Sequence, residues 1–293
     1  MWLMGALLVV GLIVTLAWGG SPYEAWRPTE RGGEGGSTPA AHETPTVVAA
    51  SRRYLRGVGV ALVGGFWAGA LVTGPAMRLI MRLLAVTGGD DAQGRITEAD
   101  EVVGDIALDG TIGLYLFGGV LPGLLSGAIY VVVRRWLPSG RLGGVAFGLL
   151  HLVVAATRVD PLRPDNRDFD IVGPGWLSVL TFGLAAVAHG MAVAAVANRF
   201  SRVFPPAGRQ RAVRLRAGLP LVPPLLLLIP GVTMLVPIGV GLVVAVVLLK
   251  VDASRRVTAS RPFRLGGSVA LALLAITLAP GAVADLRDIV ARR

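Results

Sequence analysis

Two histidines are the residues of this sequence best suited to chemistry inside a membrane. His151 and His189 each lie in a long apolar run that contains no carboxylate. Imidazole can move a proton or ligate a metal, and an ionisable group in hydrocarbon is costly unless it has a partner or a function. Counted from the outer ends of their predicted helices, His151 lies about 10 Å deep and His189 about 21 Å deep. We therefore predict no shared metal site. We interpret each histidine mainly as a neutral side chain bonded to a neighbouring helix, with ligand binding as the alternative.

A serine is predicted at the depth of the second histidine. Ser126 and His189 together would be the minimum for acyl transfer inside the membrane. The stretches around them, GLLSGAIY and AHGMAVAA, superficially resemble rhomboid proteases, which would make the serine a nucleophile. The spacing around Ser126 departs from that family's Gly-x-Ser-Gly pattern, and a serine among small residues normally serves packing. We therefore predict no catalytic residue and rank an intramembrane serine hydrolase last of three functions.

The segment 157–174 concentrates charge between two apolar runs. It holds four aspartates, three arginines and three prolines. Its oxygens could ligate calcium, but the spacing is not that of an EF-hand and arginines alternate with the aspartates. We predict a stiff, self-paired cap that holds no metal. Asp160 could pair with Arg158, or with Arg78 and Arg82, which emerge at the outer end of an earlier run. The ligand-binding candidates are His151, His189, Arg78, Arg82, Asp160, Arg163, Asp165 and Asp168.

Composition places the chain in a membrane. Of its 293 residues, 54% are hydrophobic and 16% charged, and several runs reach the roughly 20 residues that a bilayer requires. The net charge of +10 is nearly all arginine, with Lys250 as the lysine. These arginines stand at the ends of apolar runs without interleaved aromatics, which favours membrane topology over nucleic-acid binding. The absence of cysteine excludes disulfides, thiolate nucleophiles and cysteine metal sites. No cofactor is predicted.

The predicted fold is all-α, a polytopic helical membrane protein with about eight membrane segments. The spans are 2–18, 57–77, 111–133, 142–157, 175–197, two segments within 217–249, and 265–284. One helix over 217–249 would be about 50 Å long against about 30 Å of hydrocarbon, so we predict a proline-rich hairpin there, turning at Pro230 and Gly231. Residues 1–18 are an anchor or follow a mis-assigned start upstream of the true protein, 19–50 are a disordered cytoplasmic linker, and 51–293 form the bundle.

Charge also predicts the sidedness. The arginine-rich segments 134–141, 199–216 and 250–264 should be cytoplasmic. The acidic segment 88–110 and the loop 158–174 should be external, as should both termini, in a multi-pass protein of the plasma membrane.

Small residues recur at every fourth position along two spans. The glycines are Gly57, Gly65 and Gly69 in one span and Gly119, Gly123 and Gly127 in the other. Small side chains on one face let two helix backbones approach closely. This pattern predicts packing within the bundle, with a homo-oligomer or a membrane-protein partner as the alternative.

These features favour an integral membrane protein without a recognisable catalytic site, with a structural or partner-binding role in the bilayer. The alternative is a small-solute permease, because prolines in 217–249 leave carbonyls without helical donors, as in transporter binding sites. The activity is otherwise unknown, and we lean against an enzyme.

Overall fold

The computed structural model describes residues 1–23, 47–203, 219–228 and 260–292. Within these ranges the chain is helical, apart from loops and an isolated bridge between Ile96 and Val102. The longer helices are α1 (Trp2–Trp18), α2 (Val47–Ala68), α3 (Gly74–Thr87), α4 (Leu108–Tyr115), α5 (Leu121–Val133), α6 (Arg141–His151), α7 (Gly175–Val203), α9 (Val222–Leu228) and α12 (Arg261–Val290). Short π or 3-10 segments are η1 (Gly69–Thr73), η2 (Asp90–Ala92), η3 (Leu116–Val120), η4 (Arg134–Trp136), η5 (Leu152–Ala156), η6 (Arg167–Asp170) and η7 (Leu219–Leu221). The predicted all-α class is confirmed for this part of the chain.

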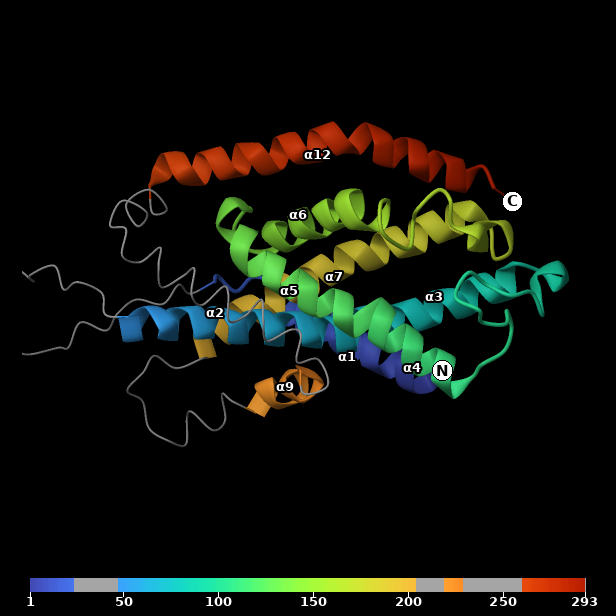
Figure 1. Ribbon diagram of the computed structural model, residues 1–293, viewed down its shortest axis with the longest axis horizontal. Helices are drawn as coiled ribbons and strands as arrows, with labels where there is room; N and C mark the ends of the chain where they lie inside the picture. Colours follow the sequence, from blue (N-terminus) through green and yellow to red (C-terminus); the bar gives the residue numbers. More distant parts are fainter. Residues whose placement is uncertain (24–46, 204–218, 229–259, 293) are drawn as a thin grey trace, which may run out of the picture.

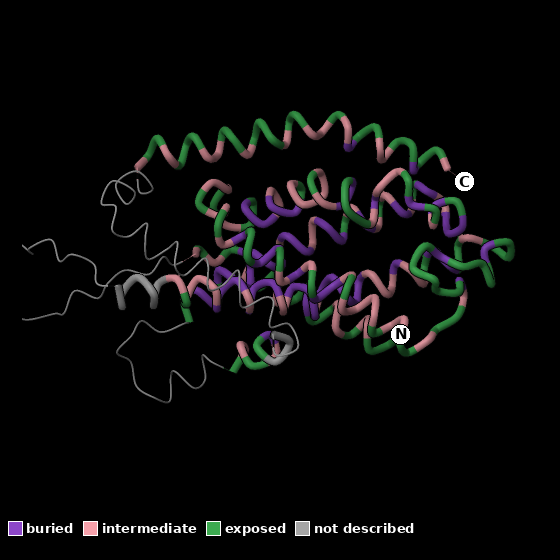
Figure 2. The backbone as a smooth tube through the Cα atoms, viewed as in Figure 1, coloured by how far each residue is buried: buried purple, intermediate pink, exposed green. Residues whose placement is uncertain are grey.

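Helix α7 is the centre of the bundle. It contacts α1, α2, α3, α5, α6 and α12, which surround it in Figure 1. Every residue of 192–198 is buried, and all but Val193, Val196 and Asn198 are alanine. Small side chains on every face let neighbouring helices approach from all directions, because packing is what holds helices together where lipid replaces water. Figure 2 shows the buried residues concentrated on α7 and the facing side of α2.

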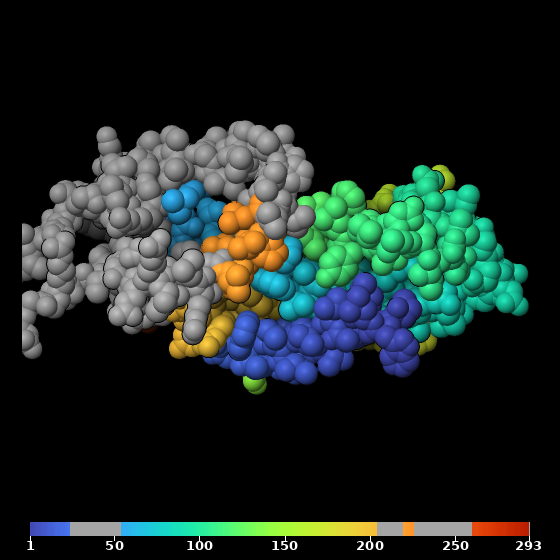
Figure 3. Space-filling view, turned by 90° about the horizontal axis from the view of Figure 1, so that it is seen from below, coloured from blue at the N-terminus to red at the C-terminus, as the bar shows by residue number. Residues whose placement is uncertain are grey.

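Four helical stretches are long and apolar enough to cross a membrane. They are Tyr54–Thr87, Leu108–Trp136, Gly175–Val203 and Arg261–Val290. Two other predicted spans are shorter apolar helices, Trp2–Trp18 and Arg141–Ala156. Figure 3 shows α1 lying along the surface of the bundle. Of the predicted hairpin in 217–249, only η7 and α9 are described, and its turn lies outside the described residues, as does most of the predicted linker. The count of eight segments stays a prediction.

The two ends of the bundle differ in their loops (Figure 1). At the acidic end, α3, η5 and α12 end and α4 and α7 begin, so the predicted external loops lie there together. At the basic end, α1, η4 and α7 end and α6 and α12 begin. Every carboxylate of the described residues lies within 90–109, 160–170 or 285–288, and therefore at the acidic end.

Two of the membrane-length helices widen into a π turn just before a proline. Pro75 follows η1 and Pro122 follows η3, each at the second position of the next α-helix. Proline has no N–H and its ring collides with the carbonyl four residues earlier. In each π turn, the residue just before the proline donates its backbone N–H to the carbonyl five residues earlier. Gly74 donates to the Gly69 carbonyl, and Leu121 donates to the Leu116 carbonyl. The helices therefore continue past both prolines.

The two predicted glycine stripes pack against each other within the chain. A Cβ added to Gly69 would lie 2.9 Å from the Cα of Val120, next to Gly119, and one added to Gly123 would lie 3.0 Å from the Cα of Gly69. The carbonyl oxygen of Gly65 would lie even closer to the Cβ added at Gly123. Gly57 differs, because its added Cβ meets only Val131 at 3.9 Å. Most of the stripe is thus occupied internally, and an oligomer through it stays an untested prediction.

A second glycine contact escaped the sequence pattern. Gly144, Gly148 and Gly190 bring α6 and α7 together, and a Cβ on Gly144 would lie 2.9 Å from the Cα of Met191. Gly144 and Gly148 lie four residues apart on α6, the same spacing as in the two stripes, so the signal is present in the sequence but only as one repeat. It fixes the position of His151, which ends α6.

Helix α12 is attached to the bundle mainly near its two ends. At the basic end, Ser268 donates to the Trp136 carbonyl at 2.8 Å. At the acidic end, Ile289 is fully buried and its backbone lies against Gly175. Apolar side chains between these points are mostly exposed, and α12 curves over the bundle in Figure 1. An apolar helix with so little buried surface suits a lipid-facing position.

Candidate functional site

The two predicted histidines meet in the interior. The rings of His151 and His189 have centroids 5.2 Å apart and an interplanar angle of 49°. His189 is only 2% exposed. The prediction that a difference in height keeps the two rings too far apart to share a ligand was therefore wrong.

The error came from counting each helix from a common outer plane. Gly148 packs against Val187. In this antiparallel pair, His151 is therefore level with Leu184, about 7.5 Å along the axis from His189. Side chains lean toward the N-terminus of their own helix, so in antiparallel neighbours these two rings lean toward each other and close the offset.

Thr73 fixes the orientation of the deeper histidine. The Thr73 hydroxyl donates to the Ala68 carbonyl at 3.4 Å, and its oxygen lies 2.6 Å from Nδ1 of His189. Which of the two donates in this bond depends on the tautomer of His189. With either tautomer, Nε2 is buried and without a hydrogen-bond partner among the described residues. The expected bond from a histidine to a neighbouring helix is present for His189.

This cluster lies beside two of the π turns. Thr73 ends η1, and His151 immediately precedes η5. Wide π turns occur often at functional sites. Chemically, two imidazoles at this distance could share one proton or ligate one ion. A third ligand is missing, since no group of three His, Asp or Glu residues suited to a metal occurs within the described ranges.

Ser126 is not part of this cluster. Its hydroxyl is buried and has no hydrogen-bond partner in the described structure. The adjacent Gly127 lies against Ala61. Thr73, the partner of His189, is about 18 Å further along the same helix at the usual helical rise. Counting from the predicted starts of the two spans places Ser126 and His189 at equal depth. This estimate is wrong, because the two helices do not begin at the same height.

The acidic end holds the second candidate cluster, organised by one arginine. Arg163 pairs with Glu98 at 2.5 Å, Asp165 at 2.9 Å and Asp160 at 3.8 Å. Asp168 accepts the backbone N–H of Glu98 at 2.8 Å. The loop 157–174 is thus tied to the acidic segment 88–107 as well as to itself. Pairing was predicted, but the contribution of Glu98 was not.

The other predicted arginine partners were wrong. Asp160 pairs with Arg163 rather than with Arg158, and Arg158 lies against Gly281 of α12. Arg82 donates to the backbone carbonyl of Gly104 at 3.3 Å instead of pairing with a carboxylate. Nε of Arg78 is buried without a partner among the described residues.

The C-terminal end of the described chain closes the same loop. Arg292 pairs with Asp170 at 3.5 Å and donates to the carbonyls of Asn166 and Pro164. Its own carbonyl accepts the N–H of Gly175 at 3.2 Å. Sequence reasoning missed this contact because nothing local to Arg292 indicates that α12 returns to the acidic end beside α7.

Burial changes the acidity of this cluster. Burial raises the pKa of Asp168 above its ordinary value, and repulsion from Glu98 adds to the rise, against the hydrogen bond from the Glu98 N–H and the attraction of Arg163. The pKa of Asp160 is raised too, with desolvation as the main cause. The Asp160 side chain is nevertheless 66% exposed, so solvent screens it and the stronger pH effect belongs to Asp168.

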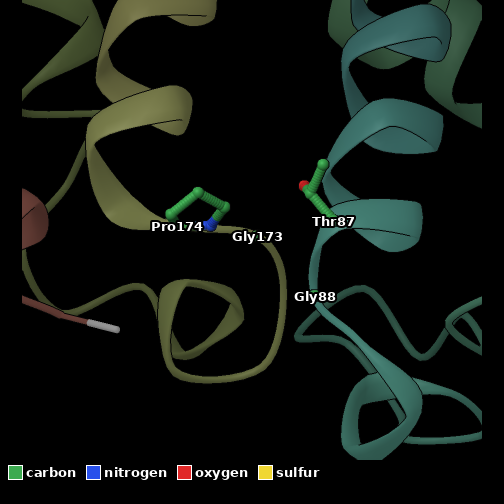
Figure 4. A pocket seen from close by; sticks show the side chains of 4 residues that line it. All are labelled: Thr87, Gly88, Gly173 and Pro174. Carbon is green, nitrogen blue, oxygen red and sulfur yellow. The ribbon is translucent and has the colours of Figure 1, made fainter.

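A small cleft opens beside this cluster. It has a volume of about 190 Å³ and is lined by Thr87, Gly88, Gly173 and Pro174. Figure 4 shows it between the end of α3 and the start of α7. The Thr87 hydroxyl already donates to the Leu83 carbonyl at 2.9 Å, so the cleft presents little free polar chemistry.

Comparison with known proteins adds no assignment to these sites. No protein-family model, no curated protein and no solved structure matches this chain.

Proposed function

We propose that this chain is a multi-pass protein of the plasma membrane with a structural or partner-binding role. Its basic end faces the cytoplasm and its acidic end faces outward. The close packing of the interior carries the proposal. Around α7 the helices meet through glycine and alanine, and two pairs of interior polar groups bond to each other, Thr73 with His189 and Tyr130 with Asn198 at 2.9 Å. Such an interior favours a rigid framework over a solute path.

The distribution of charge supports this orientation. Arginines at the basic end have no carboxylate near them in the described ranges, and cytoplasmic segments carry the excess of arginine in membrane proteins. The cap at the acidic end is held by ion pairs and suits an aqueous surface.

Reporter fusions test the orientation. A reporter inserted after Gly94 should behave as external, and one inserted after Ser139 should behave as cytoplasmic. Both reporters on the same side, or release of the chain from membranes by alkaline carbonate, would contradict the proposal.

Purification from native membranes tests the role. In a mild detergent the full chain should run as a complex with one stoichiometric membrane partner. Reconstitution into liposomes should give no solute or proton flux above that of empty vesicles. A monomer without a partner that produces such a flux would reverse the conclusion.

A small-cation or solute permease is the second candidate, favoured by one observation. Nε2 of His189 is buried and has no hydrogen-bond partner in the described structure, and the ring of His151 lies beside that of His189. Transport through this point requires that flux into liposomes be lost in His189→Gln. The matched control is Thr277→Ala, on the exposed part of α12, which should leave any such flux unchanged.

A further inference from the structure

His189 carries a buried nitrogen that makes no hydrogen bond in the described structure. The residue is 2% exposed, and Nε2 has no partner among the described residues. A polar atom left in this state normally costs stability. The ring of His151 lies beside that of His189, with the two centroids 5.2 Å apart. Neutral imidazole is a common metal ligand, so a shared metal ion would give the free nitrogen a partner.

The distance between the two rings fits one ion bound to both. A transition metal lies about 2.0 Å from an imidazole nitrogen, and therefore about 3.2 Å from the centre of the ring. With the centroids of His151 and His189 5.2 Å apart, bonds directed from the two ring centres would meet at the ion at an angle of about 110°. This angle is close to tetrahedral, so further positions on the ion stay open for ligands from outside the pair.

Thr73 holds His189 in a way that suits this bond. The Thr73 oxygen lies 2.6 Å from Nδ1 of His189, and the Thr73 hydroxyl donates to the Ala68 carbonyl at 3.4 Å. A metal on Nε2 requires the remaining proton of a neutral ring to be on Nδ1, which then donates to the Thr73 oxygen. The second nitrogen of a metal-binding histidine is usually held by an outer partner of this kind, which sets the orientation of the ring.

The exposure of the two histidines gives an ion a way in. His151 is partly exposed and His189 is buried, so an ion meets the first ring before it reaches the second.

The donors indicate the kind of ion. Calcium and magnesium take several oxygen ligands, whereas imidazole suits copper, zinc, nickel and iron. Burying a single charge costs less than burying two. Cu⁺ carries one charge and is stable with few donors, whereas Zn²⁺ in proteins is normally bound by three or four protein ligands.

We propose that His151 and His189 together bind one Cu⁺ ion in the interior of the bundle, with Nε2 of His189 as one ligand and a ring nitrogen of His151 as the other. Thr73 is a positioning residue, because it acts through His189. The ion is bound and released as Cu⁺, without a redox step. The inference goes beyond the proposed structural or partner-binding role and rests neither on that role nor on the orientation in the membrane.

The test is a titration of the metal-free full chain with Cu⁺ in detergent, without oxygen and with ascorbate, against the coloured Cu⁺ chelator bicinchoninate. The wild type should take one Cu⁺ per chain from the chelator. The chain has no cysteine, so no thiolate adds background binding. His151→Gln and His189→Gln should each lose the bound ion. His42→Gln, at the third histidine of the chain, is the matched control and should keep it.

A second variant separates the positioning role from the bulk of the side chain. Thr73→Val keeps the shape of threonine but cannot bond to Nδ1 of His189, so we expect Cu⁺ affinity to fall about 10- to 100-fold. Thr73→Ser should restore most of it. Unchanged affinity in Thr73→Val would remove the positioning role.

Four outcomes would overturn the site. They are no Cu⁺ taken from the chelator, Cu⁺ retained in both histidine variants, equal loss in His42→Gln, and sulfur instead of nitrogen ligands in the X-ray absorption spectrum of the copper. Tighter binding of Zn²⁺ than of Cu⁺ would overturn the choice of ion. If circular dichroism shows that His189→Gln does not fold, the partly exposed His151 decides the question through His151→Gln.

Discussion

At the acidic end Arg163 is surrounded by carboxylates, whereas at the basic end Arg134 lies over the ring of Tyr23 and is repelled electrostatically by Arg135 and Arg56. The first arginine ties two loops together. The second is placed by apolar packing and keeps its charge free of any described carboxylate. The comparison teaches that arginine count does not reveal function in such a chain, because the partners available to a guanidinium decide whether it ties two loops together.

The largest effect should come from breaking the framework that both ends share. Replacing Gly123 by Leu places a side chain against the backbones of Gly65 and Gly69, which cannot withdraw without separating α2 from α5. We expect a loss of at least about 3 kcal/mol in unfolding free energy, in line with severe overpacking. Unfolding in detergent measures it. Gly183→Leu is the control, because an added Cβ at Gly183 meets nothing within 4 Å. Similar melting of both variants would refute the packing role of the stripe.

A smaller effect should distinguish the two ends directly. Arg163→Gln leaves Glu98 and Asp165 without their cation and loosens the cap, so we expect a loss of about 1–2 kcal/mol. Arg167, exposed in the same loop, is the matched control, and Arg167→Gln should stay within about 0.5 kcal/mol. Arg199→Gln at the basic end should behave like the control in lipid-free detergent. If Arg199→Gln lowered the unfolding free energy more than Arg163→Gln, the contrast between the two ends would be wrong.

The pH dependence of the cap provides a third, weaker test. Because the folded pKa of Asp168 is raised, the folded state binds its proton more tightly. The stability that protonated Asp168 contributes is therefore fully present below its unfolded pKa of about 3.9. This stability is lost as pH rises through its folded pKa. At pH 7, the unfolding free energy of Asp168→Asn should equal that of the wild type or exceed it by less than about 1 kcal/mol. This difference should vanish near pH 4. An advantage that grew on acidification would have the wrong sign.

The smallest expected effect is an unchanged melting temperature when a chelator is added. Arg163 occupies the carboxylates of the cap, so calcium should not bind there, and a chelator should leave the melting temperature unchanged. A calcium-reversible shift of several degrees, absent in Asp168→Asn, would make the cap a metal site and would end the comparison with the basic end.

Local patterns predicted the helices well and their heights poorly. Apolar runs identified α2, α5 and α7, and glycine spacing predicted close packing within the bundle, although it did not say that the two stripes meet each other. The distance between His151 and His189 was not predicted, because it depends on the register of α6 against α7, which is set where Gly144 and Gly148 meet Gly190 and its neighbours. The Glu98 and Arg292 contacts were also out of reach, because they join segments far apart in the chain.

The π turns can be understood in terms of rotational phase. Each π turn holds one residue more than an α-helical turn, so the helix beyond it is rotated by about 100° relative to an uninterrupted α-helix. Gly65 and Gly69 face α5, while Thr73, at the far end of η1, reaches His189 on α7. One helix thus presents two differently directed surfaces. Shortening η1 by a single residue would turn the whole of α3 about its axis, so the spacing there is set by angle as much as by length.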